Sequence, residues 1–200
     1  MTLRIRIMFR YAALAVVAIL STAVAVQSQA PAPADHAADH GAPSSAPKQT
    51  FTPSADVQRS YAGMKANILK AADKMPADAY SFRPTPDVRT FARVVNHVSE
   101  AQLRSCGAVN GTAPADLYKM PPETADKATI VAALQASFAE CDKAFAALSE
   151  ANLLQTFTVG PSTRARISLA WGVYAHDDEQ YATLALYMRL KGLVPPSSEK

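Results

Sequence analysis

Two histidines are the residues of this chain whose types and spacing best suit metal-ion chemistry, and a glutamine lies close to one of them. His97 follows Val94 by three residues and His176 follows Val173 by three residues, so each histidine shares a helix face with an apolar neighbour. Gln180 lies one helical turn after His176 on the same face. We therefore expect all three side chains to point toward the protein interior, where histidines from two facing helices could supply two corners of a metal site.

The same pattern allows a second interpretation, in which the histidines are core residues hydrogen-bonded to glutamine, tyrosine or backbone groups. A weak metal site and a metal-free polar cluster both remain open.

Other reactive patterns assign no catalytic residue. The chain has no glycine-rich phosphate-binding loop and no Ser-His-Asp constellation. Arg83 and Arg89 flank a proline-containing loop, where an anionic substrate could bind. A brace within the loop or an ion pair is the favoured interpretation of these two arginines.

The periodicity of apolar residues over 53–198 predicts the helices that must position the histidines. Apolar residues recur at three- and four-residue steps in four stretches, namely 54–75, 90–108, 126–149 and 167–191. Pro76 ends the first stretch, Asp126 suits a helix N-cap, and Gly192 follows the last helix as a C-terminal glycine. We find no convincing strand, so the predicted fold class is all-α, a four-helix bundle. Its connections are longer than simple hairpins need, so we expect some of them to cross the bundle or to cover one of its ends.

The first 25 residues have the pattern of a secretory signal peptide. Arg4, Arg6 and Arg10 precede an apolar stretch, and the small-residue pattern at 23–25 predicts cleavage after Ala25. The apolar run of about 16 residues is shorter than the roughly 20 that a spanning helix needs. We therefore expect an exported protein, periplasmic or secreted, with no stable membrane insertion after cleavage.

Residues 26–52 are predicted to be a disordered spacer between the signal peptide and the domain. Alanine, proline and serine dominate this segment, and few large apolar residues are present to offset the entropy of ordering it. His36 and His40 are four residues apart in the spacer, a spacing that could bind metal on a helix. A polar linker without fixed geometry is the favoured interpretation.

Charge and cysteine content bear on the partners and the compartment. Without the three signal-peptide arginines, the 20 basic residues fall to 17 and equal the 17 acidic residues. A neutral mature chain lacks the concentrated basic surface of nucleic-acid-binding proteins, so we expect no nucleic-acid partner. In an exported protein, Cys106 and Cys141 can form a disulfide or can be two small buried core residues.

Two parts of the predicted bundle resemble the DinB-like family. The stretch Tyr80–Phe91, followed by His97, resembles the family's loop and second helix. The stretches His176–Tyr181 and Tyr187–Ser198 resemble its last helix and tail. The resemblance covers about residues 55–198, and it implies a four-helix bundle in a family whose members are often homodimers.

The resemblance also implies a metal site and a class of activity. Many DinB-like proteins bind a divalent metal, commonly zinc or nickel, through one histidine of the second helix and two of the last. By position these ligands become His97, His176 and Gln180, with glutamine in place of the third histidine. Its neutral amide oxygen is a poor ligand for zinc beside imidazole. Glu100 or Glu179 could replace it, although Glu179 lies off the face shared by His176 and Gln180. The implied function is a metal-dependent transferase or hydrolase with a small-molecule substrate. The alternative is a metal-free binding or scaffold bundle with a degenerate metal site.

Overall fold

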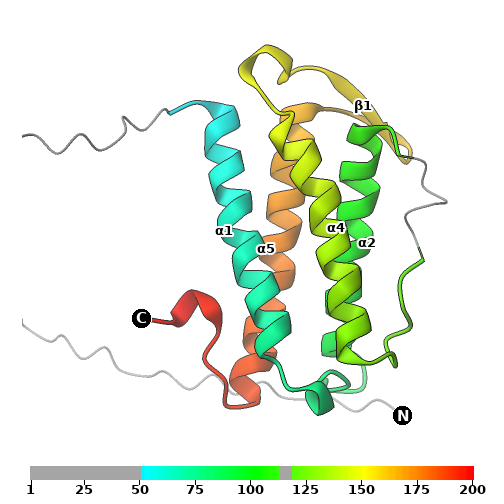
Figure 1. Cartoon of the computed structure of the whole chain (residues 1–200), viewed down its shortest axis with the longest axis vertical. Coiled ribbons are helices and arrows are strands. Elements are labelled where there is room, and N and C mark those ends of the chain that lie inside the picture. Colours follow the sequence, from blue (N-terminus) through cyan, green and yellow to red (C-terminus); the bar gives the residue numbers. More distant parts are fainter. Residues whose placement is uncertain (1–50, 113–118) are drawn as a thin grey trace, which may run out of the picture. The chain divides into compact units, whose positions relative to one another are not determined.

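The computed structural model describes residues 51–112 and 119–200, and these residues form a four-helix bundle (Figure 1). Its long helices are α1 (Pro53–Lys74), α2 (Phe91–Asn110), α4 (Lys127–Ala146) and α5 (Arg166–Leu190). The predicted fold class is confirmed. The predicted signal peptide and residues 26–50 of the predicted spacer lie outside the described residues. Among the helices that are described, none is long and apolar enough to cross a membrane.

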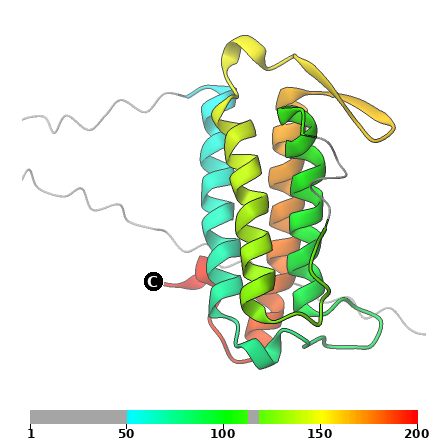
Figure 2. The ribbon, with the colours of Figure 1, turned by 45° about the vertical axis from the view of Figure 1, so that its right-hand side comes forward.

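Neighbouring helices form a ring in which α1 contacts α5 and α4, and α2 contacts α4 and α5 (Figures 1 and 2). Helices α2 and α4 run in the same direction, because the α2–α4 pairs Gln102–Ser137 and Cys106–Cys141 are each separated by 35 residues. The end of α2 and the start of α4 therefore lie at opposite ends of the bundle. Of the two predicted alternatives, a connection that crosses the bundle is therefore required between α2 and α4.

Local sequence signals set the helix ends. The side chains of Thr52, Thr90 and Asp126 accept hydrogen bonds from backbone N–H groups in the first turns of α1, α2 and α4. Gly111 and Gly192 follow α2 and α5 with φ angles of 72° and 75°, which residues with a side chain rarely adopt. The predicted N-cap Asp126 and terminal Gly192 are thus confirmed.

Apolar side chains from all four helices fill the centre of the bundle. Tyr61 of α1 stacks on Phe145 of α4 with ring centroids 3.9 Å apart, and it lies near Phe138. The Tyr61 hydroxyl donates a hydrogen bond to Asp142 at the surface of α4. Burial of large side chains such as Ile68 and Phe91, both fully buried, favours the folded state by about 2–3 kcal/mol for each side chain.

The expectation of no strand is wrong for the segment between α4 and α5. Strands β1 (Thr156–Val159) and β2 (Ser162–Ala165) pair antiparallel, and Val159 lies opposite Ser162. The two-residue turn is formed by Gly160, with a φ of 58°, and Pro161, the arrangement typical of a type II′ hairpin turn. The hairpin lies at one end of the bundle (Figure 2), and its strands of four residues are too short for a clear alternating pattern.

Helices α2 and α4 end at other residues than predicted. Helix α2 continues past the predicted end at Ala108 to Asn110, because Gly111 takes the left-handed conformation that ends the helix. Helix α4 ends at Ala146 instead of Ser149. Ser149 caps a separate short helix, η2 (Glu150–Asn152), and its backbone N–H donates to the Asn152 side chain. Two further short helices, η1 (Ala77–Ala79) and η3 (Pro196–Ser198), follow α1 and α5.

Candidate functional site

The two domain histidines meet between α2 and α5. The Nε2 atoms of His97 and His176 are 3.2 Å apart, and the rings are tilted by 65° with centroids 5.0 Å apart. Their side chains are 23% and 26% exposed, so both lie at the edge of the core and remain open to solvent. The predicted meeting of two histidines from facing helices is therefore present, although they lie less deeply than expected.

A carboxylate lies close to the second ring nitrogen of each histidine. Nδ1 of His97 is 3.6 Å from Oε2 of Glu100, and Nδ1 of His176 is 3.8 Å from Oδ1 of Asp177. Glu100 is held by Arg93, whose two terminal nitrogens lie 2.9 and 3.1 Å from the two carboxylate oxygens. Carboxylates in this position fix the orientation and tautomer of metal-binding histidines in other proteins.

Asp177 is the most deeply buried acid of this cluster, with its side chain 1% exposed. Its Oδ2 accepts a hydrogen bond of 2.8 Å from the Gln102 amide, and the Gln102 oxygen accepts one of 2.8 Å from Ser137 of α4. Oδ1 of Asp177 and Nδ1 of His176 have no hydrogen-bond partner among the described residues. A series of hydrogen-bonded side chains thus runs from α4 through α2 to α5. It ends at Asp177 and His176, each of which has one atom without a hydrogen-bond partner.

Burial shifts the pKa values of two groups in the cluster. Burial raises the pKa of the Asp177 carboxyl, and the nearby His176 ring and the hydrogen bond from Gln102 oppose the shift. The pKa of His97 is lowered first by desolvation and then by the charge of Arg89 and the neighbouring His176 ring, with Glu100 acting in the opposite direction. A lowered pKa keeps His97 neutral at neutral pH, which is the form that binds metals.

The donor atoms of the histidine pair suit a divalent metal. With zinc–nitrogen distances of about 2.0–2.1 Å, two ligand nitrogens of a tetrahedral site lie about 3.3–3.4 Å apart. The observed 3.2 Å separation of the Nε2 atoms is close to that value. The same separation also allows one ring to donate a hydrogen bond to the other. Within residues 51–112 and 119–200, no group of three or more His, Cys, Asp or Glu residues could hold a metal ion.

Gln180 is buried, as predicted, with 7% of the residue exposed. It lines a hollow with Arg89, Glu179 and Tyr187, and that hollow is not lined by either histidine. In the part of the chain that the structure describes, no hydrogen bond joins Gln180 to His97 or His176. The structure therefore brings two of the three predicted ligands into direct contact, and the third lies one turn along α5.

A cavity of about 310 Å³ opens beside the histidine pair. Its walls come from α2, α5 and β2, and they combine apolar, polar and charged side chains. The lining residues are His97, Ala101, Gln102, Arg104, Ser105, Arg164, Leu169, Gly172, Val173, His176 and Asp177. A volume of this size is typical of a small-molecule site.

Comparison with protein families identifies the fold. The family model described as the DinB superfamily matches residues 61–183, more than half of the chain. The chain belongs to the DinB superfamily. No functionally curated protein matches this DinB-superfamily chain. The match spans α2 and the histidine-bearing part of α5, so both histidines lie within the family domain.

Solved structures of DinB-like proteins have the same fold. A DinB-like protein from Bacillus cereus is 16% identical, with a TM-score of 0.57, over 70% of this chain and 93% of that one. A DinB-like protein from Bacillus subtilis is 14% identical, with a TM-score of 0.54, over 68% of this chain and 92% of that one. At these identities the similarity establishes the fold of the DinB-superfamily domain.

The sequence analysis missed three parts of this DinB-superfamily site. Asp177 and Gln102 are buried between α2 and α5, and Arg164 reaches the cavity from β2. Asp177 could have been found, because it lies four residues after Val173 and four before Tyr181, on the most buried line of α5. Arg164 gave no such signal, since the hairpin that carries it was not predicted.

Proposed function

We propose that this DinB-superfamily domain binds a divalent metal ion, zinc or nickel, through Nε2 of His97 and Nε2 of His176, and acts as a transferase or hydrolase on a small molecule. The observation that carries the proposal is the 3.2 Å separation of the two Nε2 atoms, with a carboxylate near each opposite ring nitrogen. A divalent ion held there would supply Lewis-acid chemistry, which both reaction classes use.

The protein's own groups prepare the two imidazoles for this role. An ionised carboxylate near Nδ1 favours the tautomer with the proton on Nδ1, which leaves the Nε2 lone pair free. Glu100 serves His97 in this way, and Asp177 serves His176. Because Gln102 binds Oδ2 of Asp177, the other oxygen is left for the His176 side.

The adjoining cavity would hold the substrate. Leu169 and Val173 form part of its wall and are both buried, so they exclude water from one side of the histidine pair. Two histidine ligands leave coordination positions open, as catalytic metal sites require. We assign no separate general base. Apart from the histidine cluster with Asp177, the titratable side chains of the cavity wall are two arginines, which do not act as bases at neutral pH.

The test is the metal content of the purified protein, prepared without a histidine tag, by elemental mass spectrometry. We expect about one ion per chain in the wild type, and its loss in His176→Ala and in His97→Ala. The matched control is the double variant His36→Ala/His40→Ala, which removes the chain's two other histidines and should keep the ion. A metal-free wild type, or equal loss in the control, would overturn the metal assignment.

A metal-free binding or scaffold bundle is the second candidate function, and the residue at the third ligand position favours it. Gln180 replaces a histidine, and the two rings can hydrogen-bond to each other directly. This alternative predicts that Gln180→His creates zinc binding or strengthens it greatly, measured by calorimetric titration. It fails if the native protein already binds zinc as tightly as the variant does.

Export is the proposed location of this activity. The amino-terminal sequence supports a cleaved signal peptide and a periplasmic or secreted protein. The disulfide between Cys106 and Cys141 supports an oxidising compartment. Mass spectrometry of the protein isolated from the periplasm or culture medium should find a mature chain that begins at Val26. An intact chain that remains in the cytoplasm would contradict the proposal.

A further inference from the structure

The cavity beside the histidine pair has two arginines on its wall, which the metal chemistry does not use. Arg104 comes from α2 and Arg164 from β2, and both residues are exposed. Among the described residues, no carboxylate forms an ion pair with either arginine, whereas Arg93 of the same helix α2 is paired with Glu100. The acid on the cavity wall is Asp177, which is buried against Gln102 and His176. The outer wall therefore presents uncompensated positive charge.

Arg164 is held in place by a glycine of α5. Its Nη2 donates a hydrogen bond of 3.1 Å to the Ser168 carbonyl, and the guanidinium lies over Gly172. A Cβ atom at position 172 would be 3.1 Å from Nη2 and 3.3 Å from Nη1, so any other residue would require the guanidinium to shift by a few tenths of an ångström. Glycine inside a helix costs about 1 kcal/mol relative to alanine. The close approach of Arg164 explains why a glycine is accommodated at this helical position.

A third arginine, Arg166, lies behind the same wall and is 9% exposed. The Gln155 amide oxygen accepts a hydrogen bond of 2.7 Å from its Nη2, and its guanidinium lies 4.7 Å from the centre of the Phe157 ring. Its Nε and Nη1 atoms are buried and have no partner among the described residues. The small hollow that Arg166 lines shares Ser105, Leu169 and Val173 with the large cavity.

A buried cation without an anionic partner is costly unless a ligand or ion compensates it. Arg166 is such a cation and lies behind the cavity wall, and the two exposed arginines on the wall also have no ionic partner among the described residues. Together they point to an anionic ligand, since a guanidinium binds carboxylate or phosphate oxygens in pairs. We propose that the cavity binds a small organic acid, whose carboxylate or phosphate group lies between Arg104 and Arg164, within the field of Arg166. The rest of the molecule lies toward His97 and His176.

This inference deepens the proposed function by naming its substrate class, but it does not depend on the metal. Arg83 does not share the role, because its Nη1 donates to the Pro86 carbonyl within the loop, as the brace interpretation predicts. Arg89 lines the separate hollow around Gln180. The anion site thus lies on α2, β2 and α5, away from the loop before α2.

The test is calorimetric titration of the metal-free protein with succinate, inorganic phosphate and the neutral analogue succinamide. We expect saturable binding of at least one anion and none of succinamide. Arg104→Gln and Arg164→Gln should each weaken binding about tenfold or more, because each removes a charge-assisted contact. The matched control Arg83→Gln should bind as the wild type does. Tighter binding of succinate than of phosphate would assign a carboxylate, and the reverse would assign a phosphate.

A glycine pair gives a second readout that a general loss of stability cannot mimic. Gly172→Ala should weaken anion binding less than Arg164→Gln does, because the guanidinium of Arg164 must shift slightly. It should keep or raise the unfolding midpoint, because alanine favours the helix. In Gly63→Ala, where nothing lies within 4 Å of the added Cβ, anion binding should not change.

Two results would overturn the proposal: no binding of either anion, or equal weakening in Arg83→Gln. Metal titration of Arg164→Gln separates this inference from the proposed function. If Arg164→Gln keeps the metal affinity but loses anion binding, the result supports both the metal site and the anion site. Metal binding by a wild type that binds no anion overturns only the anion site.

Discussion

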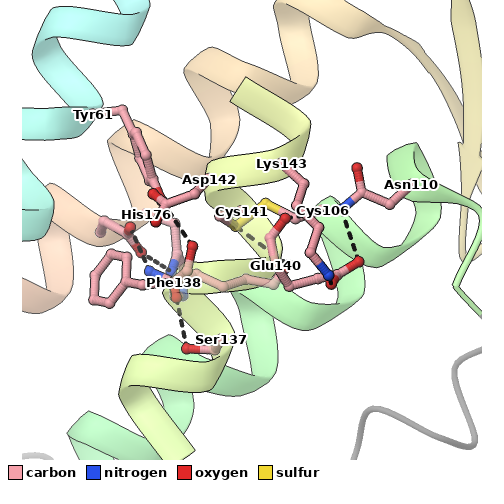
Figure 3. Close-up of a disulfide and its surroundings, with 12 residues drawn as sticks. Tyr61, Cys106, Asn110, Ser137, Phe138, Glu140, Cys141, Asp142, Lys143 and His176 are labelled. Carbon is pink, nitrogen blue, oxygen red and sulfur yellow. Dashed lines mark hydrogen bonds and ion pairs between the residues drawn. A yellow bond between two sulfur atoms is a disulfide. The ribbon is translucent and has the colours of Figure 1, made fainter. Parts of the chain in front are cut away.

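Two carboxylates lie between helices of this bundle, and their surroundings differ. Glu140 of α4 accepts hydrogen bonds from Asn110 at 2.7 Å, Thr112 at 2.8 Å and Lys143 at 2.9 Å. Figure 3 shows Glu140 with Asn110 and Lys143 near the Cys106–Cys141 disulfide. These hydrogen bonds, the one from Asn110 above all, hold the pKa of the Glu140 carboxyl below its ordinary value. Both carboxylates are buried, but Glu140 is fully compensated.

Asp177 is compensated only on one side. Gln102 binds one of its oxygens, the other has no partner among the described residues, and burial raises the pKa of its carboxyl. The ionised carboxylate of Glu140 therefore stabilises the folded protein at neutral pH, whereas the ionised carboxylate of Asp177 destabilises it. Incompletely satisfied carboxylates beside a histidine in a cavity wall are typical of functional sites. The contrast separates a structural side, between the ends of α2 and α4, from a functional side between α2 and α5.

Removing the disulfide is the strongest test of the structural side. The Cys106–Cys141 bond joins residues 35 apart, and in the chain-entropy account a loop of that size stabilises the folded state by about 3–4 kcal/mol. Cys106→Ala/Cys141→Ala should lower the free energy of unfolding by about that amount in urea titrations. Zinc affinity should not change under folding conditions. A variant that folds but no longer binds zinc would show that the two sides are coupled.

Asp177→Asn is the corresponding test of the functional side. The amide removes the charge near Nδ1 of His176, so the tautomer with a free Nε2 loses its support. We expect zinc affinity to fall about 10- to 100-fold, measured by competitive titration. The pKa of Asp177 is raised in the folded state, so above the pKa of the unfolded chain its ionised form lowers stability. The metal-free variant should therefore be as stable as the wild type or more stable, and a large loss of stability would refute this account.

The helices could be predicted from the sequence because each has a continuous apolar face and ordinary end signals. Asp126 and Gly192 act as predicted, since caps depend on a few neighbouring residues. The hairpin was missed because strands of four residues carry little periodic signal. Its turn residues, Gly160 and Pro161, were visible but indicate only a chain reversal.

The site could be predicted only in part. His97 and His176 were found because histidines on apolar helix faces are conspicuous, and their helices do pack together. Asp177 was not predicted, because the prediction placed the inward face of α5 on the line of His176. That line runs along the edge of the buried face, and Asp177 lies at the centre of that face. The disulfide remained one of two alternatives, because pairing depends on the 5.0 Å Cα–Cα distance that only the packing of α2 on α4 sets.

Glu140→Gln should have a moderate effect that depends on pH. The amide keeps an acceptor for Asn110 and Thr112 but loses the charge, which should cost about 1 kcal/mol of unfolding free energy at pH 7. Because the pKa of Glu140 is lowered by folding, its contribution is present above the ordinary glutamate pKa of about 4.3 and is lost as pH falls through the lower folded value. Urea titrations of both proteins between pH 7 and pH 3 should therefore converge at low pH. A constant difference would mean that the charge is not the cause.

Lys143→Gln should have the smallest effect and identifies what compensates Glu140. The Lys143 side chain is 69% exposed, and exposed ion pairs contribute about 0–1 kcal/mol. We expect a loss of at most about 0.5 kcal/mol, measured in the same urea titrations. Asn110→Ala is the comparison variant and should cost about 1–3 kcal/mol, because it leaves a buried carboxylate without its principal donor. Equal losses would assign the compensation to the ion pair. Asp177, which has no lysine or arginine within ion-pair distance among the described residues, would then differ from Glu140 by charge pairing instead of by hydrogen bonding.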